Sequence, residues 1–327
     1  MQYAFSFFYF FDYKIIQNAM WKHYLKVAWR NLKRAKTFSL INIIGLSLGL
    51  TCSILILLFV KDELSFDRFH EKGQQIYRIN SKSTVNGETG QSSITGTLEG
   101  PRFEQNVPGI KAFIRYQQAG TNIKRGTDVE PLRLFRTDSN FFQVFSFPLI
   151  AGDPATCLKD PYSIVLSKDE AIRQFGSTDI IGKTIQLKQD SAFVPYTVTA
   201  VAKNCPENSS IRFPALALFR ASKADEQNDE NWFSHYLNTF VLLDKNANAT
   251  QVEHQMQKYF QKDASGTFHA MLQKFGIPEN SISLPIYQLQ PLERMHLDKD
   301  VHSGNGIVAT GNITNAYIMG PLHFLSC

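Results

Sequence analysis

Two short motifs in this sequence have the residue types of known catalytic or nucleotide-binding sites. The first, GLSLG at residues 45–49, has the G-x-S-x-G spacing of a hydrolase nucleophile. Such a serine is exposed on a sharp turn between a strand and a helix. Here Ser47 lies inside a long apolar stretch, where it would face lipid or another helix. The motif therefore does not indicate a hydrolase.

The second motif, GSTDIIGKT at residues 176–184, is similar to a phosphate-binding loop. A P-loop has four residues between its glycines and leads from a strand into a helix. This stretch has five residues between Gly176 and Gly182, and it follows a predicted helix and leads into a predicted strand. We therefore expect no nucleotide site here.

The histidines and cysteines do not indicate a metal or catalytic centre. The later histidines lack the spacing of metal-ligand motifs such as H-E-x-x-H, and no Ser-His-Asp or paired-carboxylate grouping can be recognised. Among the four cysteines, Cys157 and Cys205 are the only pair that could be oxidised outside the cytoplasm, and two free thiols are the alternative. We assign no catalytic, cofactor-binding or metal-binding residue. The histidines considered are His235, His254, His269, His296 and His302.

The dominant element is residues 39–60, SLINIIGLSLGLTCSILILLFV, which contain no ionisable side chain. As a helix these 22 residues would reach roughly 33 Å, enough to cross a hydrocarbon core of about 30 Å. Fourteen of them are Leu, Ile, Phe or Val, so membrane insertion is favourable. A transmembrane helix is predicted, and a buried core helix is the alternative.

Basic residues precede this helix, with no acid among them from residue 20 onward, whereas acidic and basic residues are mixed after it. The positive-inside rule places the N-terminus in the cytoplasm and the chain after Val60 outside the cytoplasmic membrane. Residues 20–38 are predicted to form an amphipathic helix in the inner headgroup layer, and a soluble helix that packs on a partner protein is the alternative. The predicted interface residues are Trp21, Lys22, Lys26, Trp29, Arg30, Lys33 and Arg34.

Small residues recur at every fourth position inside the span, at Gly45, Gly49 and Ser53. Such a stripe lets another helix approach closely and is typical of helix packing in membranes. We therefore predict that these three residues form a helix-packing face.

The net charge of +5 is unevenly distributed. Residues 1–60 hold seven Lys or Arg and one Asp, which gives +6 for this stretch and −1 for the remaining 267 residues. The basic residues therefore lie where anionic lipid headgroups would be, and the outer region has no excess positive charge. This distribution argues against binding to nucleic acid.

The region after Val60 alternates strand-like runs with helices that have start signals. Ser167 and Glu170 are predicted to form a capping box for a helix that Gly176 ends, and Thr250 and Glu253 to form a second capping box. Residues 221–231 are polar and predict a surface loop. This alternation indicates a mixed α/β fold.

The remaining segments connect or flank these parts. Phe66, Phe69 and Gly73 keep helical spacing, so we expect the membrane helix to continue outward as a stalk. Residues 1–19 are interpreted as a mis-called N-terminal extension before Met20. Residues 301–327 are interpreted as a truncated approach to a missing second transmembrane helix, because too few apolar residues follow to span a bilayer.

Several segments in order resemble ABC transporter permeases of the FtsX-like and MacB-like type. The N-terminal match is MWKHYLKVAWRNLKRAKTFSLINIIGLSLGL followed by DELSFDRFHEKGQQIYRI. SIVLSKDEAIRQFGSTDIIGKTIQL and YTVTAVAKNCPENSSIRFP are similar to the second half of the MacB-type periplasmic core domain. The resemblance implies a membrane-anchored α/β protein of the bacterial inner membrane, with one N-terminal transmembrane helix and a mixed α+β periplasmic core domain. That domain would have a Porter-like subdomain, 64–125 and 236–300, and a β-rich Sabre-like subdomain, 126–235.

The resemblance also implies a function and partners. Cytoplasmic ATP hydrolysis by a separate ABC ATPase subunit would drive movements of the membrane helices and of the outer domain, for efflux or extracytoplasmic substrate handling. A second permease copy, identical or not, would be the partner in the membrane. The sequence departs from the family because three or more further helices should follow the outer domain, and because no ATPase is fused to it.

Two other functions remain open from the residues alone. A single-span sensor or partner-binding protein needs only one helix and an outer domain, but fewer than forty residues precede the helix, which leaves no room for a signalling domain. An anchored extracytoplasmic enzyme lacks a recognisable catalytic grouping. We therefore predict a permease subunit that is not itself an enzyme.

Overall fold

The structure is a computed structural model, and it divides into two compact units. One unit comprises Met1–Val60 and Met319–Cys327, and the other comprises Lys61–Ile318. The predicted extension 1–19, Lys22 and the predicted loop 221–231 lie outside the described residues, as does most of 301–327. The described residues are 21, 23–220, 232–279, 281–298, 300–301 and 304–308.

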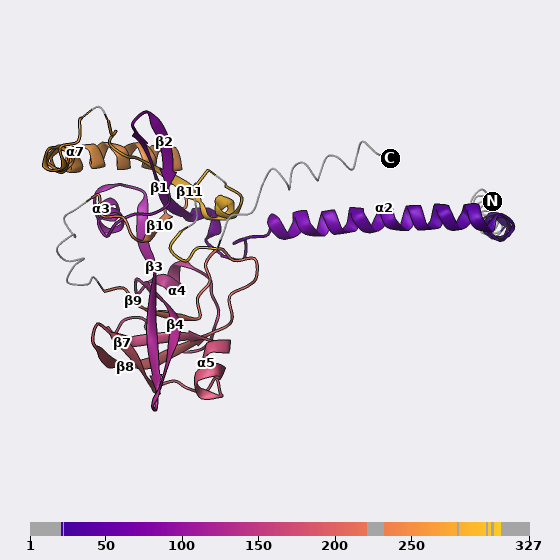
Figure 1. The fold of residues 1–327 in the computed structure, drawn as a ribbon, viewed down its shortest axis with the longest axis horizontal. Helices are drawn as coiled ribbons and strands as arrows, with labels where there is room; N and C mark the ends of the chain where they lie inside the picture. The colour runs from indigo at the N-terminus through magenta and orange to yellow at the C-terminus, as the bar shows by residue number, and fades with distance from the viewer. Residues whose placement is uncertain are drawn as a thin grey trace, which may run out of the picture. The chain divides into compact units, whose positions relative to one another are not determined.

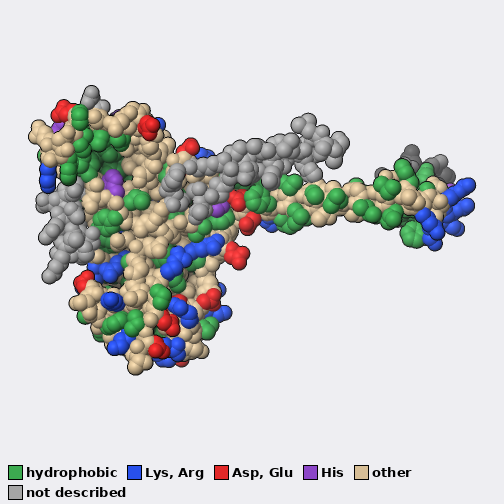
Figure 2. Space-filling model, in the orientation of Figure 1, with side chains coloured by type: hydrophobic (Ala, Val, Ile, Leu, Met, Phe, Trp, Pro, Cys, Tyr) green, Lys and Arg blue, Asp and Glu red, His purple; other side chains and the backbone are tan. Residues whose placement is uncertain are grey.

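The first unit contains the long helix α2, Lys36–Glu63, whose last three residues belong to the second unit. Residues 23–34 are also helical, and a bend at residue 35 separates them from α2. No residue of α2 is buried, and hydrophobic side chains are spread along its length in Figure 2. In the part of the chain that the structure describes, α2 is the one helix long and apolar enough to cross a membrane. The predicted apolar helix over 39–60 is confirmed.

The second unit is built on one eleven-stranded sheet. Its strand order is β11-β1-β10-β3-β4-β9-β6-β8-β5, with β2 paired to β1 and β7 paired to both β3 and β8. The β4–β9 and β6–β8 pairs are parallel and the other pairs are antiparallel. The strands are β1 (Ile76–Val85), β2 (Glu88–Ser92), β3 (Ile110–Arg125), β4 (Asp128–Thr137), β5 (Leu149–Ala151), β6 (Ser163–Ser167), β7 (Thr184–Gln189), β8 (Ala192–Ala202), β9 (Ala215–Leu218), β10 (Asn238–Leu243) and β11 (Ile286–Pro291).

Helices alternate with these strands along the chain, so the mixed α/β fold is confirmed. In Figure 1, α3 and α7 lie beside β1, β10 and β11, whereas α5 lies with β7 and β8 at the other end of the β3–β4 hairpin. That hairpin pairs from Tyr116↔Thr137 to Arg125↔Asp128 and connects the two ends of the unit. The helices are η1 (Gly73–Gln75), α3 (Glu99–Asn106), α4 (Phe141–Val144), α5 (Lys168–Phe175), α7 (Ala249–Phe275) and η2 (Leu292–Leu297).

Three clusters of buried apolar side chains form the core. One lies between α3, α7 and the sheet and includes Phe103, Trp232 and Phe260. Another packs α5 against β6 and β8 and includes Leu166 and Val198. A third, rich in phenylalanine, joins residues from Ile76 to Ile307. The predicted division into Porter-like and Sabre-like subdomains stays a prediction.

The predicted start and stop of α5 are confirmed, but the predicted capping box is only half formed. The N–H of Ser167 donates to the carbonyl of Pro214, and the Glu170 carboxylate binds Arg173 and Gln174 instead. The Ser167 side chain accepts a hydrogen bond from the backbone N–H of Glu170, and Gly176 ends the helix with a φ of 71°. A left-handed residue after the last turn favours glycine, since it has no side chain to clash with the backbone. Residues 176–184 therefore run from a helix into β7, the reverse of the order in a P-loop.

The predicted capping box of α7 is wrong. Asn248 caps this helix, and its side chain accepts from the N–H of Gln251 at 3.2 Å. Glu253 reaches β11 instead, where its Oε1 accepts from the N–H of Leu289 at 2.6 Å. Gln257, one turn later, accepts from the N–H of Tyr287 and donates to the carbonyl of Pro285. Two side chains of α7 thus bind the free backbone edge of the outermost strand.

Candidate functional site

The chain leaves α2 through a tight turn and not through a helical stalk. The helix ends at Glu63, and Asp67 has a φ of 57°, which lies in the left-handed region. Asp and Asn tolerate this region better than most residues with side chains, so an aspartate can break the helix here. The expected stalk is therefore wrong. The helical spacing of Phe66 and Phe69 reflects packing against the outer domain, since Phe66 is 8% exposed and Phe69 packs against the phenylalanine-rich cluster.

Asp67 is bound to a loop that lies far away in the sequence. Its side chain is fully buried, and Oδ1 accepts from the N–H of Ser210 at 2.8 Å and from the hydroxyl of Ser209 at 3.4 Å. The N–H of Asp67 donates to the carbonyl of Asn208 at 2.9 Å. The Asn208 amide donates in return to the carbonyl and hydroxyl of Ser65. The turn and the loop 204–213 are thus joined by reciprocal hydrogen bonds.

The electrostatics of Asp67 differ from those of an ordinary surface carboxylate. Burial raises its pKa to about 6, although the hydrogen bonds from Ser210 and Ser209 and the charge of Arg212 act in the opposite direction. Arg212 also donates to the carbonyls of Ser209 and Glu207, and these hydrogen bonds stabilise the loop 204–213.

A second attachment joins residues 70–72 to the segment after α4. The N–H of Ser146 donates to Nδ1 of His70 at 3.0 Å, and the Ser146 hydroxyl accepts from the N–H of Glu71 at 2.9 Å. The ammonium of Lys72 donates to the carbonyl of Gln143 at 2.6 Å. Burial lowers the pKa of His70 to about 4, so the ring is neutral at pH 7 and Nδ1 is free to accept.

A third attachment involves η2. The rings of Phe66 and His296 are stacked, with centroids 3.4 Å apart, and Nε2 of His296 lies 3.2 Å from Oε2 of Glu63. Burial lowers the pKa of His296, while the charge of Glu63 acts in the opposite direction. His296 is therefore mainly neutral at pH 7, and its contact with Phe66 is one of packing.

The end of the described chain returns to the same loop. The N–H of Val308 donates to the carbonyl of Ser210 at 2.9 Å, and Ile307 forms an antiparallel bridge with Ile211. Ser210 thus binds the chain that enters the outer domain, through Asp67, and the chain at its far end, through Val308. We call this arrangement the joint, and it comprises residues 63–72, 143–146, 204–213, 292–297 and 304–308.

The joint connects residues 63–72 to several other chain segments through hydrogen bonds and ring stacking. Sequence reasoning missed it because the bonds that join its segments link residues 71 to 143 positions apart. The available signals were the polar run Asn208, Ser209 and Ser210 before the apolar strand β9, and the acidic Asp67 directly after Phe66.

The structure places the predicted packing face on α2 but brings it to no partner among the described residues. A Cβ added at Gly45 or Gly49 would meet no atom within 4 Å. The Ser53 hydroxyl donates back to the carbonyl of Gly49 at 2.6 Å. Ser47 lies inside the helix, where its carbonyl accepts from Thr51, so no nucleophile turn exists there. The packing role of the three residues stays a prediction.

The predicted interface residues, apart from Lys22, are exposed on the helix before α2. Trp21 and Trp29 are 66% and 61% exposed, and the ammonium of Lys33 lies 5.3 Å from the Trp29 ring centroid. Basic side chains gather at this end of the helix in Figure 2. The other members, Lys26, Arg30 and Arg34, are also exposed, and their contact with lipid stays a prediction.

The remaining candidates for chemistry are dispersed. Cys157 and Cys205 are free thiols, so the alternative to a disulfide holds in the structure. Among the described residues, no group of three or more His, Cys, Asp or Glu side chains is placed to hold a metal ion.

Comparison with known proteins matches this chain to a family. The family of MacB-like periplasmic core domains matches residues 39–259. No curated protein matches the chain. A crystallised domain from a Porphyromonas gingivalis protein described as a permease is 17% identical and has a TM-score of 0.57, with 76% of this chain and 98% of that one covered.

Two further solved structures are similar at a lower level. One is the periplasmic region of MacB from Actinobacillus actinomycetemcomitans, 13% identical, with a TM-score of 0.39 and 60% of this chain and 92% of that one covered. The other is the extracellular domain of the noncanonic ABC-type transporter YknZ from Gram-positive bacteria, 14% identical, with a TM-score of 0.39 and 64% and 99% covered. The family match extends over more than half of the sequence, from the apolar helix to α7, and the permease domain shares the fold. The chain belongs to the family of proteins with a MacB-like periplasmic core domain.

Proposed function

We propose that the chain is a permease subunit of a MacB- or FtsX-type ABC transporter and passes movement from the membrane to the outer domain. A separate ATPase subunit would hydrolyse ATP in the cytoplasm, and the outer domain would handle substrate on the other side. The joint is the observation that carries this proposal. α2 continues to Glu63, and Asp67, four residues later, is already bound to the loop 204–213.

The geometry of the joint suits the transmission of force. A flexible linker of several residues would absorb a displacement of the helix end, because its end-to-end distance fluctuates. Here residues 65–72 form hydrogen bonds to the loop 204–213 and to residues 143–146, and Phe66 packs on His296. A displacement of Glu63 would therefore reach the sheet within a few residues.

The proposal includes an arrangement in the membrane. The N-terminus would be cytoplasmic and the outer domain periplasmic, because unopposed basic residues precede α2. The basic helix would lie among lipid headgroups, and Gly45, Gly49 and Ser53 would face a second permease copy or further helices.

The test is whether ATP hydrolysis moves the outer domain through the joint. The tagged full-length chain is purified from native membranes with any associated ABC ATPase and reconstituted in nanodiscs. Spin labels at Leu40, in α2, and at Asn86, in the exposed β1–β2 turn, report the distance between the two units. We expect ATP with Mg²⁺ to shift the distance distribution. Asp67→Ala should keep ATP hydrolysis but lose the shift.

Asp169→Ala is the matched control, because it removes an exposed carboxylate from the same unit and should leave the shift unchanged. The proposal is wrong if no ATPase associates with the chain, or if ATP is hydrolysed without any shift in the unaltered chain. A shift caused by an added extracytoplasmic ligand in the absence of an ATPase would favour the single-span sensor instead.

A further inference from the structure

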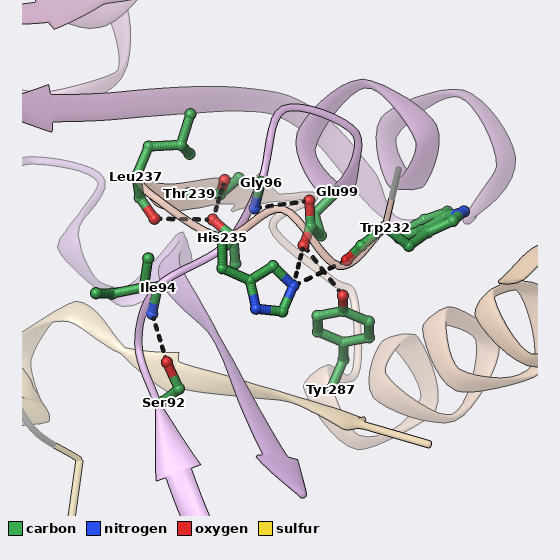
Figure 3. Close-up of polar contacts among 10 residues, drawn as sticks. Ser92, Ile94, Gly96, Glu99, Trp232, His235, Leu237, Thr239 and Tyr287 are labelled. Atoms are coloured by element: carbon green, nitrogen blue, oxygen red, sulfur yellow. Dashed lines mark hydrogen bonds and ion pairs between the residues drawn. The ribbon is translucent and has the colours of Figure 1, made fainter. Parts of the chain in front are cut away.

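A buried carboxylate outside the joint binds the segment that precedes β10. The Glu99 side chain, at the start of α3, is fully buried (Figure 3). Its Oε1 accepts from the Tyr287 hydroxyl at 3.0 Å and lies 3.3 Å from Nε2 of His235. Its Oε2 accepts from the N–H of Gly96 at 3.0 Å. One carboxylate thus contacts three separate parts of the chain.

The segment 232–237 is held at both ends around this contact. At one end, the Trp232 side chain is 2% exposed, and its indole N–H donates to Asp263 on α7 at 2.9 Å. At the other end, the N–H groups of Tyr236 and Leu237 both donate to the carbonyl of Thr95. His235 lies between these anchors, with Nε2 2.8 Å from the carbonyl of Trp232.

The approach of the two segments is close enough to require a glycine. A Cβ at Gly96 would lie 2.5 Å from the carbonyl oxygen of Ser234, closer than packed atoms allow. The backbone of 94–99 and that of 232–237 are therefore in direct contact beside Glu99. An opening of one segment would expose the carboxylate to water.

A buried carboxylate is stable only when it is paired and hydrogen-bonded. Protonated His235 supplies a positive charge and a donor, whereas neutral His235 supplies at most a donor. Burial by itself lowers the pKa of His235, but the hydrogen bond and charge of Glu99 and the carbonyl of Trp232 raise it above its ordinary value.

Other ionisable groups around His235 do not compete with Glu99. Tyr287 on β11 stays protonated, since burial and the Glu99 charge hold its pKa well above 10. On α7, Asp263 binds Trp232, and together with Arg102 of α3 it acts on the Tyr259 hydroxyl. Among the described residues, Glu99 is the charged group that shifts His235.

We propose that residues 232–237 form a proton-dependent latch, closed while protonated His235 neutralises Glu99 and loosened when His235 loses its proton. The direction follows from linkage, because the folded chain binds the proton more tightly than the unfolded chain. The stabilisation is complete below the unfolded pKa of about 6.5 and is lost as pH rises through the higher value in the folded chain. This inference does not depend on the proposed transport function.

The latch is tested on the full chain in nanodiscs by tryptophan fluorescence and by hydrogen exchange. The sequence has three tryptophans, so Trp21→Phe with Trp29→Phe leaves Trp232 as the reporter. From about pH 5 to about pH 9 we expect one transition of Trp232 emission, with its midpoint above about 6.5. Protection of the Tyr236 and Leu237 amides, corrected for intrinsic exchange, should fall several-fold across the same transition.

Two variants separate the latch from general pH effects. His235→Gln keeps a hydrogen-bond donor but cannot titrate, so the transition should disappear, and Glu99→Gln should move the midpoint to lower pH. His254→Gln, which removes an exposed histidine of α7, should change nothing. A transition that persists in His235→Gln, or unchanged emission and protection in the reporter chain across the whole range, would overturn the proposal. The His235→Gln result decides the question even if Glu99→Gln fails to fold.

Discussion

Replacing Asp67 by asparagine should stabilise the outer domain at neutral pH, although the residue lies at the centre of the joint. The folded pKa of about 6 lies roughly two units above the ordinary 3.8. At about 1.4 kcal/mol per unit, keeping this carboxylate ionised in the folded state costs about 3 kcal/mol above pH 6. Asparagine carries no charge, keeps an oxygen that accepts from Ser210, and tolerates the left-handed backbone.

The expected gain for Asp67→Asn is somewhat smaller than this cost. The amide nitrogen would take the place of Oδ2, which has no hydrogen-bond partner, and a buried donor without a partner costs about 1 to 3 kcal/mol. We expect a net gain of up to about 2 kcal/mol above pH 6. Below pH 4 the advantage should vanish, because the wild-type carboxyl is then protonated in both states. The wild-type stability therefore falls, relative to the variant, as pH rises from about 4 to about 6.

Alanine at the same position is the informative comparison. It leaves the N–H of Ser210 without an acceptor, at about 1 to 3 kcal/mol, and it adopts the left-handed backbone at a cost of about 1 kcal/mol. The unpartnered amide of asparagine costs about as much as the unpartnered N–H of Ser210, so Asp67→Ala should be about 1 kcal/mol less stable than Asp67→Asn. Urea unfolding of the full chain, followed by Trp232 emission in the Trp21→Phe and Trp29→Phe background, measures both differences. Equal stability of asparagine and alanine, or a wild-type advantage over asparagine at pH 7, would refute this account.

Two further predictions concern the membrane segment. If the N-terminus is cytoplasmic, an impermeant thiol reagent on intact spheroplasts should modify a cysteine placed at Asn86 but not one placed at Lys26, and the reverse pattern would show the opposite orientation. If the small residues of α2 form a packing face, Gly49→Leu should weaken helix association in detergent by several-fold, whereas Leu57→Ile should not. Unchanged association of Gly49→Leu would remove the basis for that face.

Features with local signals were predictable from the sequence. The apolar run 39–60 and the Ser167 and Gly176 ends of α5 depend on neighbouring residues, and the structure bears them out. The start of α7 depends on local signals too, but two candidates compete there. Asn248 caps the helix instead of Thr250, and the Glu253 side chain accepts from β11 instead of from the helix start.

Features that depend on distant pairing were not predictable. Nothing near Asp67 identifies Ser209 and Ser210 as its partners, and nothing near β4 identifies β9 as its parallel neighbour. The helical spacing of Phe66 and Phe69 was misleading, because apolar residues in a tight turn can bury themselves against a core without forming a helix. The joint and the latch both consist of such long-range contacts, so the resemblance to permeases indicated the fold but neither site.

The capped edge of β11 limits how this domain can meet other polypeptides. An exposed edge strand can pair with a strand of another chain and extend the sheet across a subunit boundary. At β11 the N–H groups of Tyr287 and Leu289 are already bound by Gln257 and Glu253, so an incoming strand would have to displace α7. We therefore expect copies of this domain not to fuse their sheets at β11, and to associate through side-chain surfaces that can separate and re-form.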